Sequence, residues 1–223
     1  MTLSVIIPVF NEEAILADFL NQTMHWPVKE IIVVDGGSTD QTQAIIQASP
    51  HHRLLISKKG RGNQMNEGAK VSTSDILLFL HADSTFPPDG FSEISNALQE
   101  TGLVGGAFRL KINTNSLYLK LIAMMANIRS FLFGLPYGDQ GIFVRRAVFN
   151  KMGGYRDFPL MEDVDFILRL KREGSMTLLH QAVTTSARRW NKQGVVFTSL
   201  RNVILLILYF MGVSPKQLVK WYD

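Results

Sequence analysis

The feature that most constrains the fold is an alternation of short apolar runs with helical patterns along the first part of the chain. The runs are rich in β-branched residues, and segments such as IIVV and ILLFL show no polar alternation, which is typical of strands buried on both faces. The order therefore predicts a parallel sheet covered by helices on both faces. The expected strands are Leu3–Val9, Glu30–Asp35, Arg53–Ser57 and Asp75–Leu80, and the expected helices are Glu12–Met24, Asp40–Ala48 and Gly62–Val71.

The second half of the chain has a less regular pattern. No stretch rich in Pro, Ser or Gly marks a linker, so we expect a single domain over residues 1–223. The elements expected here are a strand at Val104–Ile112, a helix at Leu117–Phe133, a glycine-flanked segment at Gly138–Val144, a helix at Val164–Arg172, and short strands at Met176–Leu179 and Val183–Ala187.

Composition excludes several classes of function. The formal net charge of +4 suits an anionic ligand or a membrane surface but falls short of a nucleic-acid-binding stripe, so no nucleic acid is expected as a partner. Absence of cysteine excludes disulfides and thiolate metal sites. The opening MTLSVIIPVF lacks the pattern of a signal peptide and is expected as a core strand. We therefore expect a cytoplasmic location.

A long apolar segment lies near the C-terminus, at Val195–Val213. Arg201 and Asn202 interrupt it, and its uninterrupted run Val203–Met211 is about half of the ~20 residues that span a bilayer. It is expected to form a buried or interfacial helix. Basic residues flank it, which indicates peripheral contact with the inner face of the cytoplasmic membrane, while core packing and a homodimer interface stay open as alternatives.

Polar side chains follow three of the expected strands directly. They belong to the segments Asn11–Glu13, Asp35–Asp40 and His81–Asp83, and a parallel sheet binds its ligands at this edge. Asp35 could accept hydrogen bonds from a nucleobase imide or from ribose hydroxyls. The glycines after it permit a tight turn, and Ser38 or Thr39 could cap the next helix. A capped turn that binds nothing is the alternative.

The segment Lys58–Asn66 is the densest basic and glycine-rich loop, and it stands just before an expected helix. Backbone amides at a helix N-terminus, together with Lys and Arg side chains, form an anion site that would fit a diphosphate or the carbonyls of a base. A solvated basic loop is the alternative.

Asp83 follows the most apolar strand. A carboxylate there is costly unless it is solvated or meets a cation, and its oxygen suits Mg²⁺ or Mn²⁺. His81 is either a further ligand or polar lining. Because one carboxylate makes a weak metal site, diphosphate oxygens and water would have to complete the coordination shell.

Two further clusters stand in the second half. Glu162, Asp163 and Asp165 open a helix, where they either complement the helix dipole or supply a general base. The segment Ser186–Trp190 places two guanidiniums beside an indole, which could hold phosphate charge, stack on a sugar, or anchor the following helix.

In this order, the segments SVIIPVFNEE, IIVVDGGSTDQT, KGRGNQMNEGA, LLFLHAD, MEDVDF and ARRW resemble those of the family 2 glycosyltransferases of the GT-A fold. The likeness covers about the first 190 residues and is greatest to the small, single-domain bacterial type found beside radical-SAM genes. It implies a Rossmann-like three-layer α/β/α sandwich with a mostly parallel central sheet. Residues 1–112 would bind the nucleotide-sugar, residues 113–190 the acceptor, and residues 191–223 would form apolar helices.

The resemblance also implies roles for individual residues. Asp83 matches the last acid of the DxD motif and would bind the divalent metal, Mg²⁺ or Mn²⁺, with His81 beside it. Asp163 matches the second residue of the ED motif and would be the catalytic base, next to Glu162. Arg189 and Trp190 match the end of the QxxRW motif and, with Asp139, would contact phosphate and acceptor. The expected donor-nucleotide set is Pro8, Phe10, Glu12, Asp35, Gly37, Arg61, Asn66 and Ala82.

Two departures from the family pattern matter. His81 replaces the first acid of DxD, and Ser186 stands in place of the Gln of QxxRW, which favours single transfer over polymerisation. The implied mechanism is direct displacement with inversion at the anomeric carbon. The expected donor is a nucleotide-sugar, with a UDP-sugar favoured over a GDP-sugar, and the expected acceptor is a hydroxyl compound that is lipid-linked or membrane-proximal. Asp163 would deprotonate the acceptor while the metal stabilises the departing nucleoside diphosphate.

Two other functions fit the same sheet. A sugar-phosphate nucleotidyltransferase would place a glycine-rich phosphate loop after the first strand, where this chain has Phe10–Glu13. A non-catalytic nucleotide-sugar-binding protein is the other alternative, prompted by His81.

Overall fold

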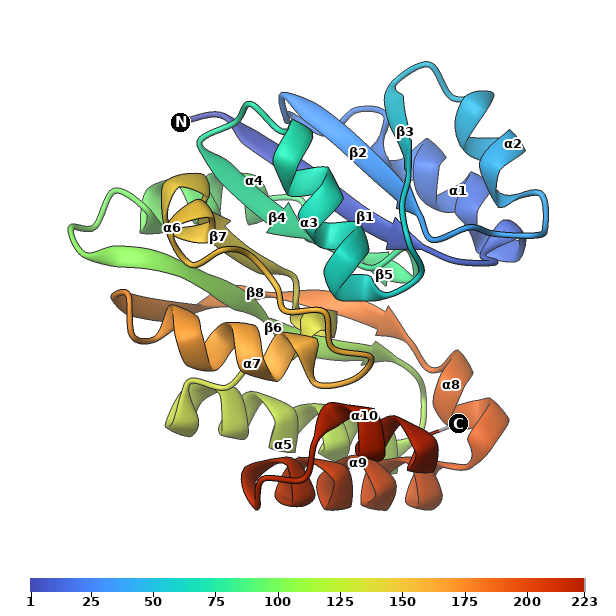
Figure 1. The fold of residues 1–223 in the computed structure, drawn as a ribbon, viewed down its shortest axis with the longest axis vertical. Coiled ribbons are helices and arrows are strands. Elements are labelled where there is room, and N and C mark those ends of the chain that lie inside the picture. Colours follow the sequence, from blue (N-terminus) through green and yellow to red (C-terminus); the bar gives the residue numbers. More distant parts are fainter. Residues whose placement is uncertain (223) are drawn as a thin grey trace.

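The computed structural model describes residues 1–222, apart from the side chains of Arg189 and Lys192. Its centre is a mixed sheet with the strand order β3-β2-β1-β4-β7-β6-β8-β5 (Figure 1). Four neighbouring pairs are parallel and three are antiparallel. The strands are β1 Leu3–Val9, β2 Glu30–Asp35, β3 His52–Ile56, β4 Ile76–Phe79, β5 Ser84–Thr85, β6 Leu103–Asn113, β7 Ile142–Arg145 and β8 Ser175–Ser186.

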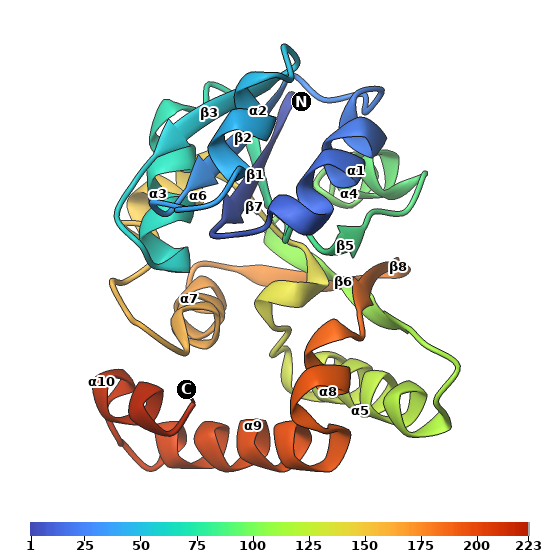
Figure 2. The ribbon, with the colours of Figure 1, turned by 90° about the vertical axis from the view of Figure 1, so that its right-hand side faces the viewer.

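Helices cover both faces of the sheet, as Figure 2 shows for α1 and α4 on one side of β1 and α3 and α6 on the other. Two apolar cores, one on each face, result from this arrangement. The α-helices are α1 Glu13–Thr23, α2 Thr42–Gln47, α3 Arg61–Val71, α4 Gly90–Ala97, α5 Leu117–Phe133, α6 Arg146–Lys151, α7 Glu162–Leu170, α8 Arg188–Gln193, α9 Val195–Phe210 and α10 Pro215–Leu218. Short 3-10 helices lie at Gly138–Gln140 (η1) and Val219–Trp221 (η2).

The first four strands form as expected, and three of them, β1, β2 and β4, are mostly apolar runs buried on both faces. Ile6 of β1 and Ile32 of β2 are fully buried on the face covered by α3. Val5 of β1 and Val33 of β2 are fully buried on the face covered by α1. The alternation of side chains along each strand therefore feeds both cores.

Strand β6 passes close to both of its neighbours. A Cβ atom built on Gly105 would lie 2.4 Å from the Phe143 carbonyl oxygen of β7, and one on Gly106 would lie 2.2 Å from the Thr177 carbonyl oxygen of β8. The two glycines are therefore required for this approach. Strand β6 pairs with β7 in the antiparallel direction and with β8 in the parallel direction, so it connects the two halves of the sheet.

Two expectations for local structure are wrong. The two short strands expected at Met176–Leu179 and Val183–Ala187 are one strand, β8, because a bulge opposite β6 absorbs the polar residues between them. Neither Ser38 nor Thr39 caps α2, which begins at Thr42 without a side-chain cap. Instead, the Ser38 hydroxyl donates to the carboxylate of Asp35.

Helix α9 forms within the apolar C-terminal segment. Thr198 and Leu205 are buried, whereas other apolar residues along the helix are exposed. None of the described helices combines the length and hydropathy needed to cross a bilayer.

Candidate active site

A pocket of about 170 Å³ lies beside the carboxyl end of β4 and the first turn of α7. It receives polar side chains from both halves of the chain, among them several of the predicted site residues. The predicted residues that line it are Arg61, His81, Asp83, Asp139, Asp163 and Trp190.

Asp83 lies just after β4 and is half-buried at the edge of this pocket. Burial raises the pKa of its carboxyl, and the neighbouring Glu12 carboxylate raises it further, while the Arg188 guanidinium opposes both effects. An acid in this state gains from a nearby cation. Asp83 therefore has an environment in which a bound cation would be favourable.

The His81 ring lies beside Gly138 of η1, on the same side as Asp163. A Cβ atom built on Gly138 would lie 3.4 Å from His81 Nε2 and 3.5 Å from Asp163 Oδ2. Burial lowers the pKa of His81 to about 3, with a contribution from the Arg61 charge. The imidazole is therefore neutral at pH 7, which is the form that binds metals.

The metal-binding side chains in this pocket fit a divalent ion only if a bound ligand supplies further oxygen atoms. Among the described residues, no group of three or more His, Cys, Asp or Glu side chains is arranged to hold an ion. One carboxylate and one neutral imidazole remain, at Asp83 and His81. Mg²⁺ and Mn²⁺ accept such a partial site when phosphate oxygens and water fill the other positions.

Asp163 is held in the first turn of α7 by two backbone amides. Its Oδ2 accepts a hydrogen bond from Gly138 N at 2.8 Å, and its Oδ1 accepts one from Val164 N at 2.8 Å. Met161, the residue just before the helix, has a φ of 65°, a left-handed conformation that is unfavourable for a side chain of this size. This turn fixes a carboxylate at the pocket in one orientation.

Glu162 points instead towards α3. It is 3% exposed, and its Oε1 lies 2.8 Å from Arg61 Nε. Burial raises the pKa of Glu162, while the Arg61 charge lowers it; the Glu162 charge is also the main cause that raises the pKa of Arg61. Glu162 therefore orients Arg61, which lines the pocket.

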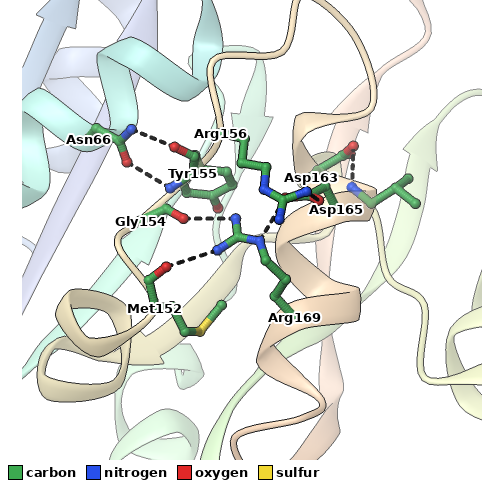
Figure 3. A network of polar contacts seen from close by, with 9 residues as sticks. Asn66, Met152, Gly154, Tyr155, Arg156, Asp163, Asp165 and Arg169 are labelled. Carbon is green, nitrogen blue, oxygen red and sulfur yellow. Dashed lines mark hydrogen bonds and ion pairs between the residues drawn. The ribbon is translucent and has the colours of Figure 1, made fainter. Parts of the chain in front are cut away.

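Asp165 serves the structure of the loop before α7. Figure 3 shows it beside Arg156 and Arg169, whose guanidinium nitrogens lie 3.0 and 2.7 Å from its oxygens. Arg169 also donates to the carbonyls of Met152 and Gly154. Of the three carboxylates in this turn, only Asp163 lines the pocket.

Two buried polar atoms in the pocket wall have no protein partner. They are Asp139 Oδ1 and Trp190 Nε1. Burial raises the pKa of Asp139 to about 6; the Arg129 charge opposes this effect, and Asp163 and Asp83 add to it. Buried polar groups are nearly always paired, so both atoms are suited to hydrogen bonds with a ligand.

Asp35 is fully buried at the end of β2. Its Oδ2 accepts from the amides of Gly37 and Ser38, each at 2.9 Å, and from Gln43 Nε2 at 2.8 Å. These bonds shape the turn. Gly37 has open space where a Cβ would stand, so a ligand could approach the backbone there. Contact of either residue with a nucleotide stays a prediction.

Other members of the predicted donor set have partners within the protein. Lys59 Nζ lies 4.0 Å from the centre of the Phe10 ring. The Glu12 carboxylate lies 2.8 Å from Arg188 Nη2. The Asn66 amide pairs with the backbone of Tyr155 through two bonds of 2.8 Å (Figure 3), so nucleotide contact would require these bonds to break.

Three predicted site residues remain. Pro8 is half-buried within β1, and Ala82 is buried between His81 and Asp83. The side chain of Arg189 lies outside the part of the chain that the structure describes. The roles predicted for all three stay predictions.

Sequence patterns missed several residues of the pocket wall. Tyr137, Asn202, Leu205 and Tyr222 line it, and Arg129 lies over the Tyr137 ring at 3.4 Å. Asn202 carries a local signal, because it is an amide within an apolar helix. The others reach the pocket through contacts between distant segments.

Several solved structures have a similar fold. TarS 1-349 of S. aureus superposes with a TM-score of 0.66 at 17% identity, covering 92% of this chain and 65% of that chain. Glucosyl-3-phosphoglycerate synthase of Mycobacterium tuberculosis, solved with Mn²⁺, UDP and phosphoglyceric acid, also superposes with a TM-score of 0.66. The identity is 20%, and the match covers 95% of this chain and 79% of that chain. The expected α/β fold of GT-A type, with a mostly parallel mixed sheet, is confirmed.

Sequence relatives identify the family. Residues 4–157 match the model of Glycosyl transferase family 2. A PGL/p-HBAD biosynthesis glycosyltransferase of Mycobacterium bovis is 31% identical over 74% of this chain and 68% of its own length. The probable glycosyltransferase YdaM of Bacillus subtilis is 26% identical over 77% of this chain. The match covers only 47% of the length of YdaM. The chain belongs to glycosyl transferase family 2, so the nucleotidyltransferase alternative is wrong.

Proposed function

We propose that the protein moves a sugar from a UDP-sugar donor to a hydroxyl acceptor, with inversion at the anomeric carbon, in a reaction that depends on Mg²⁺ or Mn²⁺. The observation that carries the proposal is the meeting of Asp163, Asp83 and Arg61 in one pocket. A base, a metal or phosphate site and a fixed cation are the three components that such a transfer needs.

The choice of UDP rests on proteins of similar fold. TarS has been solved in complex with UDP-GlcNAc, and glucosyl-3-phosphoglycerate synthase with UDP and Mn²⁺. Their identity to this chain is 17% and 20%, so the donor is inferred from a shared fold. The basic loop around Lys59 and Arg61 is the part of this chain that suits a diphosphate.

Asp83 and His81 would hold the metal, which would neutralise charge on the departing diphosphate. Asp83 brings a half-buried carboxylate, and His81 a neutral ring nitrogen. Arg61, oriented by Glu162, adds a cation that is already in place before the reaction.

Asp163 would accept the proton of the acceptor hydroxyl. As that oxygen forms its bond to the anomeric carbon, the bond from this carbon to the diphosphate oxygen breaks, and the electron pair leaves with UDP. The two amides on Asp163 aim the carboxylate without neutralising it. Asp139 and Trp190, with their unpartnered buried atoms, would bind hydroxyls of the sugar or acceptor.

The remaining assignments are part of the same proposal. Residues 1–112 would bind the donor, with Pro8, Phe10 and Gly37 near the nucleotide, and residues 113–190 would bind the acceptor. A single transfer, a cytoplasmic location and the small type found beside radical-SAM genes also stay predictions.

A donor panel tests the proposal. Purified protein is incubated with UDP- and GDP-sugars and a set of alcohol acceptors, with Mn²⁺, with Mg²⁺ or with EDTA, and the released nucleotide is identified. We expect UDP release that stops in EDTA and a product whose anomeric configuration, read by NMR, is opposite to that of the donor. Retained configuration would refute the displacement mechanism, and UDP binding without turnover of any donor would favour a non-catalytic binding protein.

A further inference from the structure

Two helices on one side of the molecule expose apolar side chains that no described element covers. Helices α5 and α9 contact each other and lie together at the bottom of Figures 1 and 2. Soluble monomers rarely expose large contiguous apolar patches, so a surface of this kind indicates a binding site.

The exposed residues of the two helices follow the same spacing. On α5 they recur at intervals of four and three residues, as they do on α9, and this spacing places them along one stripe of each helix. The α5 stripe is Leu117, Leu121, Met124, Ile128 and Phe131. The α9 stripe is Val196, Leu200, Val203, Ile207 and Phe210. Leu117 is 81% exposed and Phe131 76%.

The sequence around these stripes carries only positive charge. Residues 101–138, which contain α5, hold four Lys or Arg residues and no Asp or Glu. Residues 174–222, which contain α9, hold six Lys or Arg residues and no Asp or Glu. The protein's acidic residues lie in the other segments and at its C-terminal residue. Of these basic residues, Lys120 on α5 and Lys216 and Lys220 after α9 are exposed, so the two segments offer positive and no negative charge, as in proteins that bind anionic membranes.

We propose that α5 and α9 dock the protein on an anionic lipid bilayer, with both apolar stripes in the interfacial layer and the basic residues against lipid headgroups. A second copy of this chain is disfavoured as the occupant. Facing copies would bring together two basic surfaces without the acidic partners that pair charges across helix contacts.

The same helix joins this surface to the reaction site. Asn202 and Leu205, on the inner side of α9, line the catalytic pocket, as does Tyr222 near the C-terminus. A molecule anchored in the bilayer would reach the pocket past this helix. Resting on the proposed function, we assign the acceptor to hydroxyl compounds that are held in the membrane by an apolar chain.

Co-sedimentation measures the docking without reference to catalysis. The full chain is mixed with vesicles of phosphatidylglycerol and phosphatidylcholine, or of phosphatidylcholine alone, at low and at high salt. We expect binding to the anionic vesicles that weakens as salt rises, and at least about tenfold weaker binding to neutral vesicles, because basic residues near an anionic surface are attracted to its headgroups.

Single substitutions locate the contact. Phe131→Glu on α5 and Leu200→Glu on α9 should each weaken vesicle binding about tenfold or more, since each removes an apolar side chain that the bilayer would bury and adds repulsion. Ile56→Glu is the matched control, because Ile56 is a 64% exposed apolar residue on β3, outside this surface. Melting temperatures confirm that the variants are folded.

The outcomes separate the alternatives. Protein that stays in the supernatant with anionic vesicles at low salt refutes the docking, as does equal loss of binding in the Ile56→Glu control. A dimer in solution that Phe131→Glu dissociates would assign the surface to a second copy. Vesicle binding together with sugar transfer only to water-soluble alcohols would retain the docking and the enzyme but reject the membrane-held acceptor.

Discussion

At the scale of single residues, the first turn of α7 separates three carboxylates that look alike in sequence. Glu162 pairs with Arg61, Asp165 pairs with two arginines, and Asp163 faces the pocket. The spacing predicted that the turn is acidic and near the site. It did not distinguish among the three, because their partners come from segments distant in the sequence or from the loop before the helix.

Asp163→Asn should abolish most of the transfer. The amide keeps the shape and can still meet the Val164 amide, but it cannot accept a proton, and general-base catalysis contributes about 10²–10⁴ in rate. We expect kcat to fall by that factor while UDP affinity stays within about twofold. Initial rates and calorimetric UDP titration measure the two quantities. Asp165→Asn, outside the pocket, should reduce stability instead, and equal rate losses in both variants would contradict the role of Asp163.

Asp139→Asn should change stability in a way that depends on pH. The pKa of Asp139 is about 6, above its ordinary value near 4, so the folded state holds this proton more tightly than the unfolded chain does. Wild-type stability should therefore fall as pH rises from about 4 to about 6. At pH 7.5 the variant should be more stable by about 1–2 kcal/mol, after allowance for the exposed part of the side chain, and near pH 4 the difference should vanish.

Chemical denaturation at both pH values measures the effect of Asp139→Asn. Asp89→Asn, at an exposed carboxylate, controls for the loss of a charge itself. A stabilisation of Asp139→Asn that is as large at pH 4 as at pH 7.5 would show that burial of the Asp139 charge is not its cause.

At the scale of elements, the Arg61–Glu162 pair connects α3 with α7. Arg61 is half-exposed while Glu162 is buried, so removal of the arginine leaves a buried carboxylate without its partner. Arg61→Met should lower the free energy of unfolding by about 2–3 kcal/mol. This loss is smaller than for a fully buried ion pair because water reaches the Arg61 side of the pair. Adding Glu162→Gln should recover part of this loss, because it removes the unpaired charge.

A double-mutant cycle measures that coupling. Urea denaturation of the wild type, both single variants and the double variant gives the four free energies of unfolding. Lys70→Met, on the exposed part of α3, is the matched control for loss of a basic side chain. Strict additivity of the two changes would show that the pair does not couple the helices.

Elements differ in how fully their sequence predicts them. β1, β2 and β4 are mostly apolar and were predicted nearly to the residue, because burial on both faces leaves a nearly continuous apolar run. β8 was divided in two because its central residues are polar and partly exposed, and only pairing with β6 makes it one strand. The two-residue β5 forms only through its pairing with β8.

At the scale of the whole molecule, the pocket is assembled from segments that begin at Arg61 and end at Tyr222. A ligand that fills it should therefore stabilise the whole fold. UDP with Mn²⁺ at 100 times its Kd should add about 2.7 kcal/mol to the free energy of unfolding, if it binds only the folded state. This amounts to a rise of about 5–10 °C in Tm for a chain of this size.

A thermal-shift panel of nucleoside diphosphates, each with and without Mn²⁺ or Mg²⁺, measures that effect. We expect UDP to act only with metal and GDP to act weakly. His81→Asp should lower Tm in EDTA, since it adds a carboxylate near Asp83, and should regain it with Mn²⁺. A UDP response that is the same in EDTA would contradict metal-assisted binding.

The apolar strands and the polar residues at their carboxyl ends could be predicted from the sequence, because both depend on the local order of side chains. This order predicted the class of fold and the position of Asp83, whereas Asp163 was singled out from its two acidic neighbours only by the resemblance to the family. The facing of Asp163 towards the pocket, the pairing of Glu162 with Arg61 and the contact between α5 and α9, each with exposed apolar residues, became visible in the folded structure. Those outcomes depend on contacts between segments far apart in the chain, which no local pattern records.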